Sequence, residues 1–153
     1  MSDAILDSIE ESKGLEKIGF GPRLAAAMID GIILGLVNIP ITLLLTGTVL
    51  QTDTTAAYSG MGLIATLINY ALNIGYFVYM ESSAYQATVG KQVMGLKVVA
   101  TDGTRITAGN SLGRWFSKLV SGIILGIGYL MVLWDKDKQA LHDKMAHTYV
   151  VKK

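Results

Sequence analysis

Apolar residues gather in three long runs along the chain, and the first two have the length of membrane-spanning helices. Residues 24–45 contain one charged side chain, Asp30, and residues 61–80 contain none. About 20 consecutive apolar residues are enough for an α-helix to cross the hydrocarbon core of a bilayer. The pattern therefore predicts transmembrane helices over 24–45 and 61–80.

The third apolar run, residues 119–134, is shorter than the other two. Its 16 uncharged residues would form about 24 Å of α-helix, which is less than a hydrocarbon core of about 30 Å. Three glycines also interrupt the run: Gly122, Gly126 and Gly128. The segment therefore either bends back as a re-entrant or kinked segment, or completes a third crossing.

Short β-type segments lie on both sides of the third run. Residues 93–100 and 105–107 flank an Asp-Gly pair, which is typical of a hairpin turn, and residues 148–152 form another β-type stretch. A hairpin alone is marginally stable in water, so a third strand from the tail would stabilise it. Because this pairing needs the tail and the hairpin on one side of the membrane, it favours the re-entrant third segment over a full crossing.

Residues 106–118 have the pattern of an amphipathic helix whose aromatic and basic side chains suit the headgroup region. The sequence thus predicts an all-α membrane protein with two transmembrane helices, a third short apolar segment, a small cytoplasmic β-hairpin and an interfacial amphipathic helix. We expect an acidic segment over 1–18 and one membrane domain over 19–153. Within that domain we expect a cytoplasmic loop over 81–118 and a basic tail over 135–153.

Lysine and arginine are distributed unevenly around the apolar runs. Basic residues precede the first run, none lies in residues 46–60, and five lie between the second and third runs: Lys91, Lys97, Arg105, Arg114 and Lys118. The positive-inside rule then places the N-terminus and residues 81–118 in the cytoplasm. We expect a multi-pass protein of the cytoplasmic membrane, with the lipid bilayer as its surroundings.

Composition narrows the function further. The chain is 51% hydrophobic and 16% charged, where soluble domains average about 25% charged residues. Its net charge of +1 comes from segregated charges rather than a basic patch, so we expect no nucleic acid partner. Cysteine is absent, and His142 and His147 fall on different faces of a helix, so we expect no metal site. With no nucleophile–base pair and no phosphate loop in the sequence, we predict that the protein is not an enzyme and uses no cofactor.

The most informative single residue is Asp30, because a carboxylate within a transmembrane helix costs roughly 2.5–3.5 kcal/mol on insertion scales. Arg23 lies seven residues earlier, about 10 Å along the helix and on nearly the same face. Two interpretations follow. Asp30 either belongs to an ion-pair network that fastens the first helix, or it exchanges a proton for a cation.

Two asparagines in the second run present a similar choice. Asn69 and Asn73 are four residues apart and share one face of the helix. They either line a polar path through the membrane or form hydrogen bonds between helices.

The chain resembles the RDD family of small membrane proteins, which is named for one arginine and two aspartates. The resemblance covers roughly residues 19–152. It rests on three motifs: Gly19-Phe20 with Arg23, Ala26 and Asp30; Thr88-Val-Gly-Lys91 with Gly95-Leu-Lys-Val-Val99 and Asp102-Gly103; and Gln139-Ala-Leu-His-Asp143 with Thr148-Tyr-Val-Val151. One departure is His147, where glycine is more usual in the family.

The resemblance implies an integral membrane protein with a transport role, and it makes Arg23, Asp30 and Asp143 the named trio. We expect these three residues to form a charge network near the cytoplasmic boundary, with Arg23 bridging the two carboxylates. The first functional hypothesis is a multi-pass transporter, or an exchanger of a monovalent cation and a proton, that forms a homo-oligomer. The alternative is a structural or interaction subunit that docks a cytoplasmic partner or anionic lipid.

Overall fold

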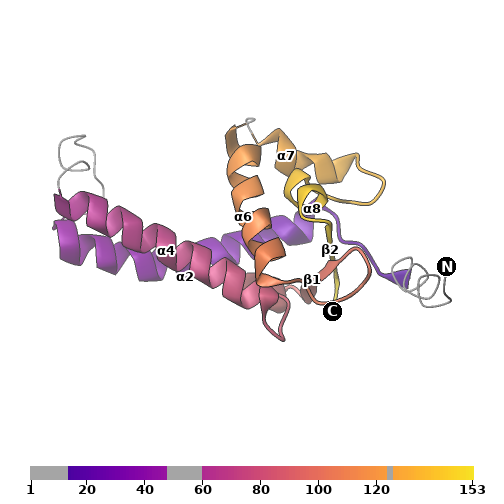
Figure 1. Ribbon diagram of the computed structural model, residues 1–153, viewed down its shortest axis with the longest axis horizontal. Helices are drawn as coiled ribbons and strands as arrows, with labels where there is room; N and C mark the ends of the chain where they lie inside the picture. Colours follow the sequence, from indigo (N-terminus) through magenta and orange to yellow (C-terminus); the bar gives the residue numbers. More distant parts are fainter. Residues whose placement is uncertain (1–13, 48–59, 124–125) are drawn as a thin grey trace.

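The computed structural model describes residues 14–47, 60–123 and 126–153, and two long helices dominate it (Figure 1). Helix α2 (Phe20–Thr46) and helix α4 (Gly60–Ser82) pack side by side, and both are long and apolar enough to cross a membrane. The two predicted transmembrane helices are therefore confirmed. Gly47 caps the C-terminal end of α2, with a φ of +71° and its N–H bonded to the carbonyl of Leu43.

The two long helices expose apolar side chains and bury very few residues. Leu36 is 71% exposed and Leu44 is 86% exposed, whereas the buried residues of α2 are Ala26 and Asp30. A helix surface of this kind is unfavourable in water but suits contact with lipid chains, which are as apolar as leucine. The surface of α2 and α4 is therefore that of a membrane protein.

The third apolar run does not form one straight helix. Helix α6 (Ala108–Ile123) joins the predicted amphipathic segment to the start of the run, and α7 (Ile127–Leu130) with the 3₁₀ turn η1 (Met131–Leu133) forms the rest. The axes of the two parts are bent by 114°. The predicted bent segment is thus confirmed, and it is longer than the 119–134 run because it includes residues from 108 onward.

Helix α6 is amphipathic in the opposite sense to a helix of a soluble protein. Its polar positions face the interior, and its apolar positions, such as Phe116 and Ile123, face outward. The buried residues of α6 are Ser111, Arg114, Ser117 and Ser121. The polar stripe of α6 therefore contributes to an internal polar site.

A small antiparallel sheet joins the middle of the chain to its end. Strand β1 (Leu96–Ala100) pairs with β2 (Thr148–Lys152), with Val98 opposite Val150. The sequence prediction was partly wrong here, because the local hairpin is reduced to one bridge between Val99 and Arg105. Residues 105–107 cannot extend as a strand, since Thr107 accepts a hydrogen bond from the Asn110 N–H and so caps the start of α6.

The pairing of β1 with β2 places the tail beside the middle loop, as the prediction required. Residues just before α2 also join this sheet, through a bridge between Lys17 and Val151. His147, the departure from the family motif, has a φ of +51°, a region that glycine adopts with less strain.

Two short helices complete the fold at the end of α2 where the sheet lies (Figure 1). Helix α5 (Val89–Val93) packs on α2, and helix α8 (Leu141–Met145) packs on α6. Both carry polar residues into the interior, where the functional site is found.

Candidate functional site

The carboxylate of Asp30 is buried, at 3% exposure, among uncharged hydrogen-bond donors from two other helices and the loop between them. The hydroxyl of Tyr76 donates to Oδ1 at 2.7 Å, and the hydroxyl of Thr88 donates to Oδ2 at 2.6 Å. The backbone N–H of Gly90 adds a third hydrogen bond, to Oδ1 at 2.8 Å. Three neutral donors thus hold the carboxylate in one orientation.

Gly90 permits this arrangement because α5 lies very close to α2. A Cβ atom at position 90 would lie 2.1 Å from the carbonyl oxygen of Ala26 and 2.9 Å from the Asp30 carboxyl group. Only a residue without a side chain fits at such a distance. The backbone N–H of Val89 also donates to the Tyr76 hydroxyl at 3.0 Å, which orients the tyrosine so that its own proton points to Asp30.

A second site, built around Arg114, contains fully charged groups. The buried guanidinium of Arg114 donates to Glu81 at 3.1 Å and to Asp143 at 2.5 Å, and it also donates to the Thr148 hydroxyl. We call this group of six side chains the Arg114 cluster: Arg23, Glu81, Lys91, Arg114, Lys118 and Asp143. Arginine suits the central position because its planar fork can donate to two carboxylates at once.

Each carboxylate of the cluster also has a further cationic partner. Glu81 forms an ion pair with Lys91 and lies 4.0 Å from Lys118, and Asp143 forms an ion pair with Arg23. Burial alone would raise the pKa of Asp143, but the neighbouring guanidinium groups of Arg114 and Arg23 outweigh burial and hold that pKa well below its usual range. Asp143 is therefore a permanent anion, and it also accepts a hydrogen bond from the Ala140 N–H at the start of α8.

His142 lies next to the cluster but stays neutral. Burial lowers its pKa to about 3, an effect that nearby Asp143 only partly opposes. The unfolded chain, with a histidine pKa near 6.5, would bind a proton between about pH 6.5 and 3 while the folded protein would not. We therefore expect the folded state to lose stability as the pH falls through this window.

Thermal unfolding in detergent between pH 8 and pH 4 measures this effect. The unfolding midpoint should fall toward pH 4 in the wild type, and the fall should be smaller in His142→Gln. The exposed His147 provides a control, since His147→Asn should keep the pH dependence of the wild type. An equal pH dependence in His142→Gln would contradict the assignment of a neutral, buried His142.

The predicted trio is brought to this end of the molecule, but its contacts differ from the prediction. The contact between Arg23 and Asp143 is confirmed, whereas in the described residues Arg23 forms no ion pair with Asp30. The other donors of Arg23 bond the carbonyls of Ile18 and Lys138, at 3.0 Å and 2.7 Å. The prediction that Arg23 bridges both carboxylates is thus wrong, because Tyr76, Thr88 and Gly90 donate to Asp30 instead, and Arg114 bridges Asp143 to Glu81.

Sequence reasoning missed Glu81 and Arg114 as central residues. Glu81 follows the second apolar run directly, a position typical of an interfacial residue, yet it is 1% exposed. One signal was present. Arg114 lies at helical spacing between Ser111, Ser117 and Ser121, and this polar stripe points inward once the apolar face of α6 is assigned to lipid.

Asn69 and Asn73 lie in a separate region of the two long helices. Asn69 donates to the hydroxyl of Thr42 at 2.9 Å and so joins α4 to α2, while Asn73 donates to the carbonyl of Asn69 at 2.7 Å. Both line a cavity of about 300 Å³ with Thr66, Tyr70 and Trp115. Asn69 therefore forms a hydrogen bond between helices, and its cavity shares no lining residue with the larger cavity described next.

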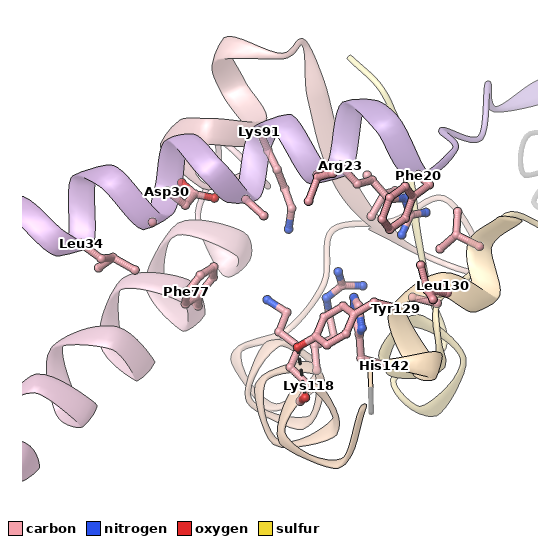
Figure 2. A pocket seen from close by; sticks show the side chains of 18 residues that line it. Phe20, Arg23, Asp30, Leu34, Phe77, Lys91, Lys118, Tyr129, Leu130 and His142 are labelled. Atoms are coloured by element: carbon pink, nitrogen blue, oxygen red, sulfur yellow. Dashed lines mark hydrogen bonds between the residues drawn. The ribbon is translucent and has the colours of Figure 1, made fainter. Parts of the chain in front are cut away.

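A cavity of about 720 Å³ lies between α2, α4, α6 and α7, and we call it the basic cavity (Figure 2). Asp30 lines it together with four basic side chains: Arg23, Lys91, Arg114 and Lys118. Figure 2 shows Lys91 and Lys118 extending into it from opposite sides. Among the described residues, no group of three or more histidine or acidic side chains is placed to hold a metal ion.

Comparisons with known proteins find chains of similar sequence. The chain is 34% identical over 150 residues to "Uncharacterized protein YxaI" of Bacillus subtilis, an alignment that covers 88% of this chain and 97% of that protein. No solved structure matches the chain.

Longer mycobacterial proteins match part of the chain. The identity is 31% over 96 residues with the "Proline-rich antigen homolog" of Mycobacterium tuberculosis, covering 58% of this chain and 40% of that protein. It is 32% over 94 residues with the "Proline-rich antigen" of Mycobacterium leprae, covering 59% and 38%.

A model of the RDD family matches residues 18–147, which include both long helices, the bent third segment and the three residues of the trio. With its two membrane-spanning helices and its apolar surface, the chain is a membrane protein of the RDD family.

Proposed function

We propose that this protein is an ion transporter of the cytoplasmic membrane that exchanges a monovalent cation for a proton at Asp30. One observation carries the proposal. In the part of the chain that the structure describes, Asp30, Glu81 and Asp143 are the buried carboxylates, and Asp30 alone has no basic side chain within ion-pair distance. Intramembrane carboxylates that lack a permanent partner are typical of ion and proton pathways.

The shell around Asp30 supports a reversible exchange. Tyr76, Thr88 and Gly90 orient the carboxylate by hydrogen bonds but do not neutralise it. A proton or a small cation can then supply the missing positive charge. Each hydroxyl oxygen in the shell still has at least one lone pair to offer a cation while its hydrogen points to the carboxylate, although Tyr76 also accepts from the Val89 N–H.

The Arg114 cluster has a different role in this proposal. Its two carboxylates are permanently paired, so they hold the helices in place rather than exchange ions. Its basic side chains also line the cavity beside Asp30, and their positive charge weakens the binding of a cation there. Weak binding favours turnover, because a transported ion has to leave its site as well as enter it.

Membrane orientation and assembly complete the proposal. The positive-inside rule favours a cytoplasmic N-terminus, with the sheet and the Arg114 cluster near the cytoplasmic face. We propose a homo-oligomer, because two long helices alone cannot enclose a path and both expose apolar faces that a second copy can cover. We further propose that the protein transports ions without catalysing a chemical reaction.

Flux in reconstituted vesicles tests the proposal. Wild-type protein should carry protons against at least one of Na⁺, K⁺ and Li⁺, as reported by a pH-sensitive dye inside the vesicles. Asp30→Asn should reduce this exchange to the rate of protein-free vesicles, because an amide side chain cannot bind and release a proton as a carboxylate does. Asp137→Asn makes the same chemical change at an exposed residue and should leave the flux unchanged.

Two outcomes would contradict the proposal: no exchange by the wild type with any of the three ions, or full exchange by Asp30→Asn. In the first case, a stable cytoplasmic protein that co-purifies with the chain would favour the alternative of an interaction subunit. The exposed basic residues of the middle region, such as Arg105, would then be the first candidates for its docking surface.

A further inference from the structure

We infer that the basic cavity binds the headgroup of an anionic phospholipid, with an acyl chain lying along its apolar wall. This goes beyond the exchange proposed at Asp30 and does not depend on it. Four basic side chains from three helices, α2, α5 and α6, line one cavity of about 720 Å³. A cavity of this size is typical of small-molecule and cofactor sites.

The charges around the cavity do not balance. Arg23, Lys91, Arg114 and Lys118 carry four positive charges, while the carboxylates near them are the two of the Arg114 cluster and Asp30. His142 also lines the cavity, but it is neutral at pH 7 because burial lowers its pKa to about 3. One positive charge is therefore in excess in a region of low dielectric, and an anionic ligand would compensate it.

The structure attributes this excess positive charge to Lys118. Its ammonium group is 4.0 Å from Glu81, whose carboxylate already has an ion pair with Lys91 and a hydrogen bond from Arg114. It also lies over the ring of Phe77, 4.1 Å from the ring centroid. Lys118 is thus the basic side chain of the cavity with the weakest anionic contact.

The remaining wall of the cavity is apolar. It includes Leu24, Leu34, Phe77 and Leu130, and of these Leu24 and Leu130 also belong to the exposed apolar surface. From Arg23 to Leu34 the cavity follows α2 for about 16 Å, at 1.5 Å per residue. In Figure 2, Leu34 and Phe77 lie at one end, and Arg23 lies toward the other.

A ligand with an anionic head and an apolar tail matches both parts of the wall. Free phosphate would pair with the basic side chains but would leave the apolar wall uncovered. Basic pockets between membrane helices are known to bind phosphorylated lipid headgroups on the cytoplasmic side. The combination therefore favours a phospholipid from the surrounding bilayer over a soluble anion.

Lipid titration of the purified protein in detergent tests the inference, by native mass spectrometry and by the thermal unfolding midpoint. Phosphatidylglycerol should bind and raise the midpoint, whereas phosphatidylcholine and inorganic phosphate should not. Lys118→Gln should weaken phosphatidylglycerol binding about fivefold, since one basic residue near a membrane surface contributes about 1 kcal/mol. The exposed Lys136 is the matched control, and Lys136→Gln should bind like the wild type.

The inference would be overturned by an equal response to phosphatidylcholine, or by Lys118→Gln binding phosphatidylglycerol as well as Lys136→Gln does. Protection by inorganic phosphate as strong as that by phosphatidylglycerol would replace the lipid site with a small-anion site. Asp30→Asn should lose ion exchange but bind phosphatidylglycerol at least as tightly as the wild type, because it removes a negative charge from the cavity wall. A failure of the lipid site and a failure of the proposed transport therefore give different results.

Discussion

Replacing Arg114 with glutamine is expected to destabilise the protein by about 3–5 kcal/mol, the usual effect of removing one partner of a buried ion pair. Arg114 is 1% exposed and bridges Glu81 to Asp143. Without the guanidinium, Glu81 keeps Lys91 and Lys118 and Asp143 keeps Arg23, but the buried group that joins the two carboxylates is lost. The connection from α4 through α6 to α8 would also be broken. The thermal unfolding midpoint in detergent is the measurement.

Three further variants separate this effect from a general loss of charge. Arg105→Gln removes an exposed guanidinium that donates to the carbonyl of Ser82, so it should lower the midpoint far less. Arg114→Lys should be intermediate, because an ammonium group cannot hold the same two-carboxylate geometry. The double variant Arg114→Gln/Asp143→Asn should lose less stability than the two single losses added together. Equal midpoints for Arg114→Gln and Arg105→Gln would contradict the central role of Arg114.

Gly90→Ala is expected to have the second large effect. The added Cβ would lie 2.1 Å from the Ala26 carbonyl oxygen, so α5 would have to move away from α2. Overpacking of this kind typically costs about 1–3 kcal/mol. The movement would also break the hydrogen bond from the Gly90 N–H to Asp30, and such bonds to charged groups contribute about 1.5–3 kcal/mol. We expect a lower unfolding midpoint in detergent and a loss of ion exchange.

Gly113→Ala is the matched control, because it makes the same substitution in α6, where among the described residues nothing beyond its chain neighbours and the helix's own backbone lies within 4 Å of the added Cβ. Alanine is favoured over glycine inside a helix by up to about 1 kcal/mol, so this variant should be as stable as the wild type or more stable. If Gly90→Ala behaved like Gly113→Ala, the close contact between α5 and α2 would be wrong.

The positions of the membrane helices could be predicted because lipid imposes a simple rule on the sequence. Runs without charge, such as residues 61–80, can only be buried in apolar surroundings, and their length sets the helix. The partner of β1 was harder to predict. Its pairing with β2 depends on contacts between residues about 50 positions apart, whereas the local hairpin signal at Asp102-Gly103 favoured a nearer partner.

Only part of the candidate site could be predicted from the sequence, because a charged residue is conspicuous within an apolar run but not at the edge of one. Asp30 was evident because a lone carboxylate within an apolar run is expensive. Arg114 was not, because Trp115, Phe116 and Lys118 follow it, and this mixture of aromatic and basic residues is typical of an interfacial helix. Its burial follows from the bend after α6 and from the position of α8, which brings Asp143 to it. The bend could be predicted from the short, glycine-interrupted third run, but the position of α8 could not be predicted from local spacing.

The central claim is that Asp30 releases a proton when a cation binds. Infrared difference spectroscopy of the reconstituted protein measures this directly, by recording the carbonyl band of a protonated carboxyl group before and after addition of Na⁺, K⁺ or Li⁺. The account predicts that the transported cation removes one such band in the wild type and in Asp137→Asn, and that Asp30→Asn shows no band to remove. No change with any of the three ions, or the same loss of a band in Asp30→Asn, would contradict it.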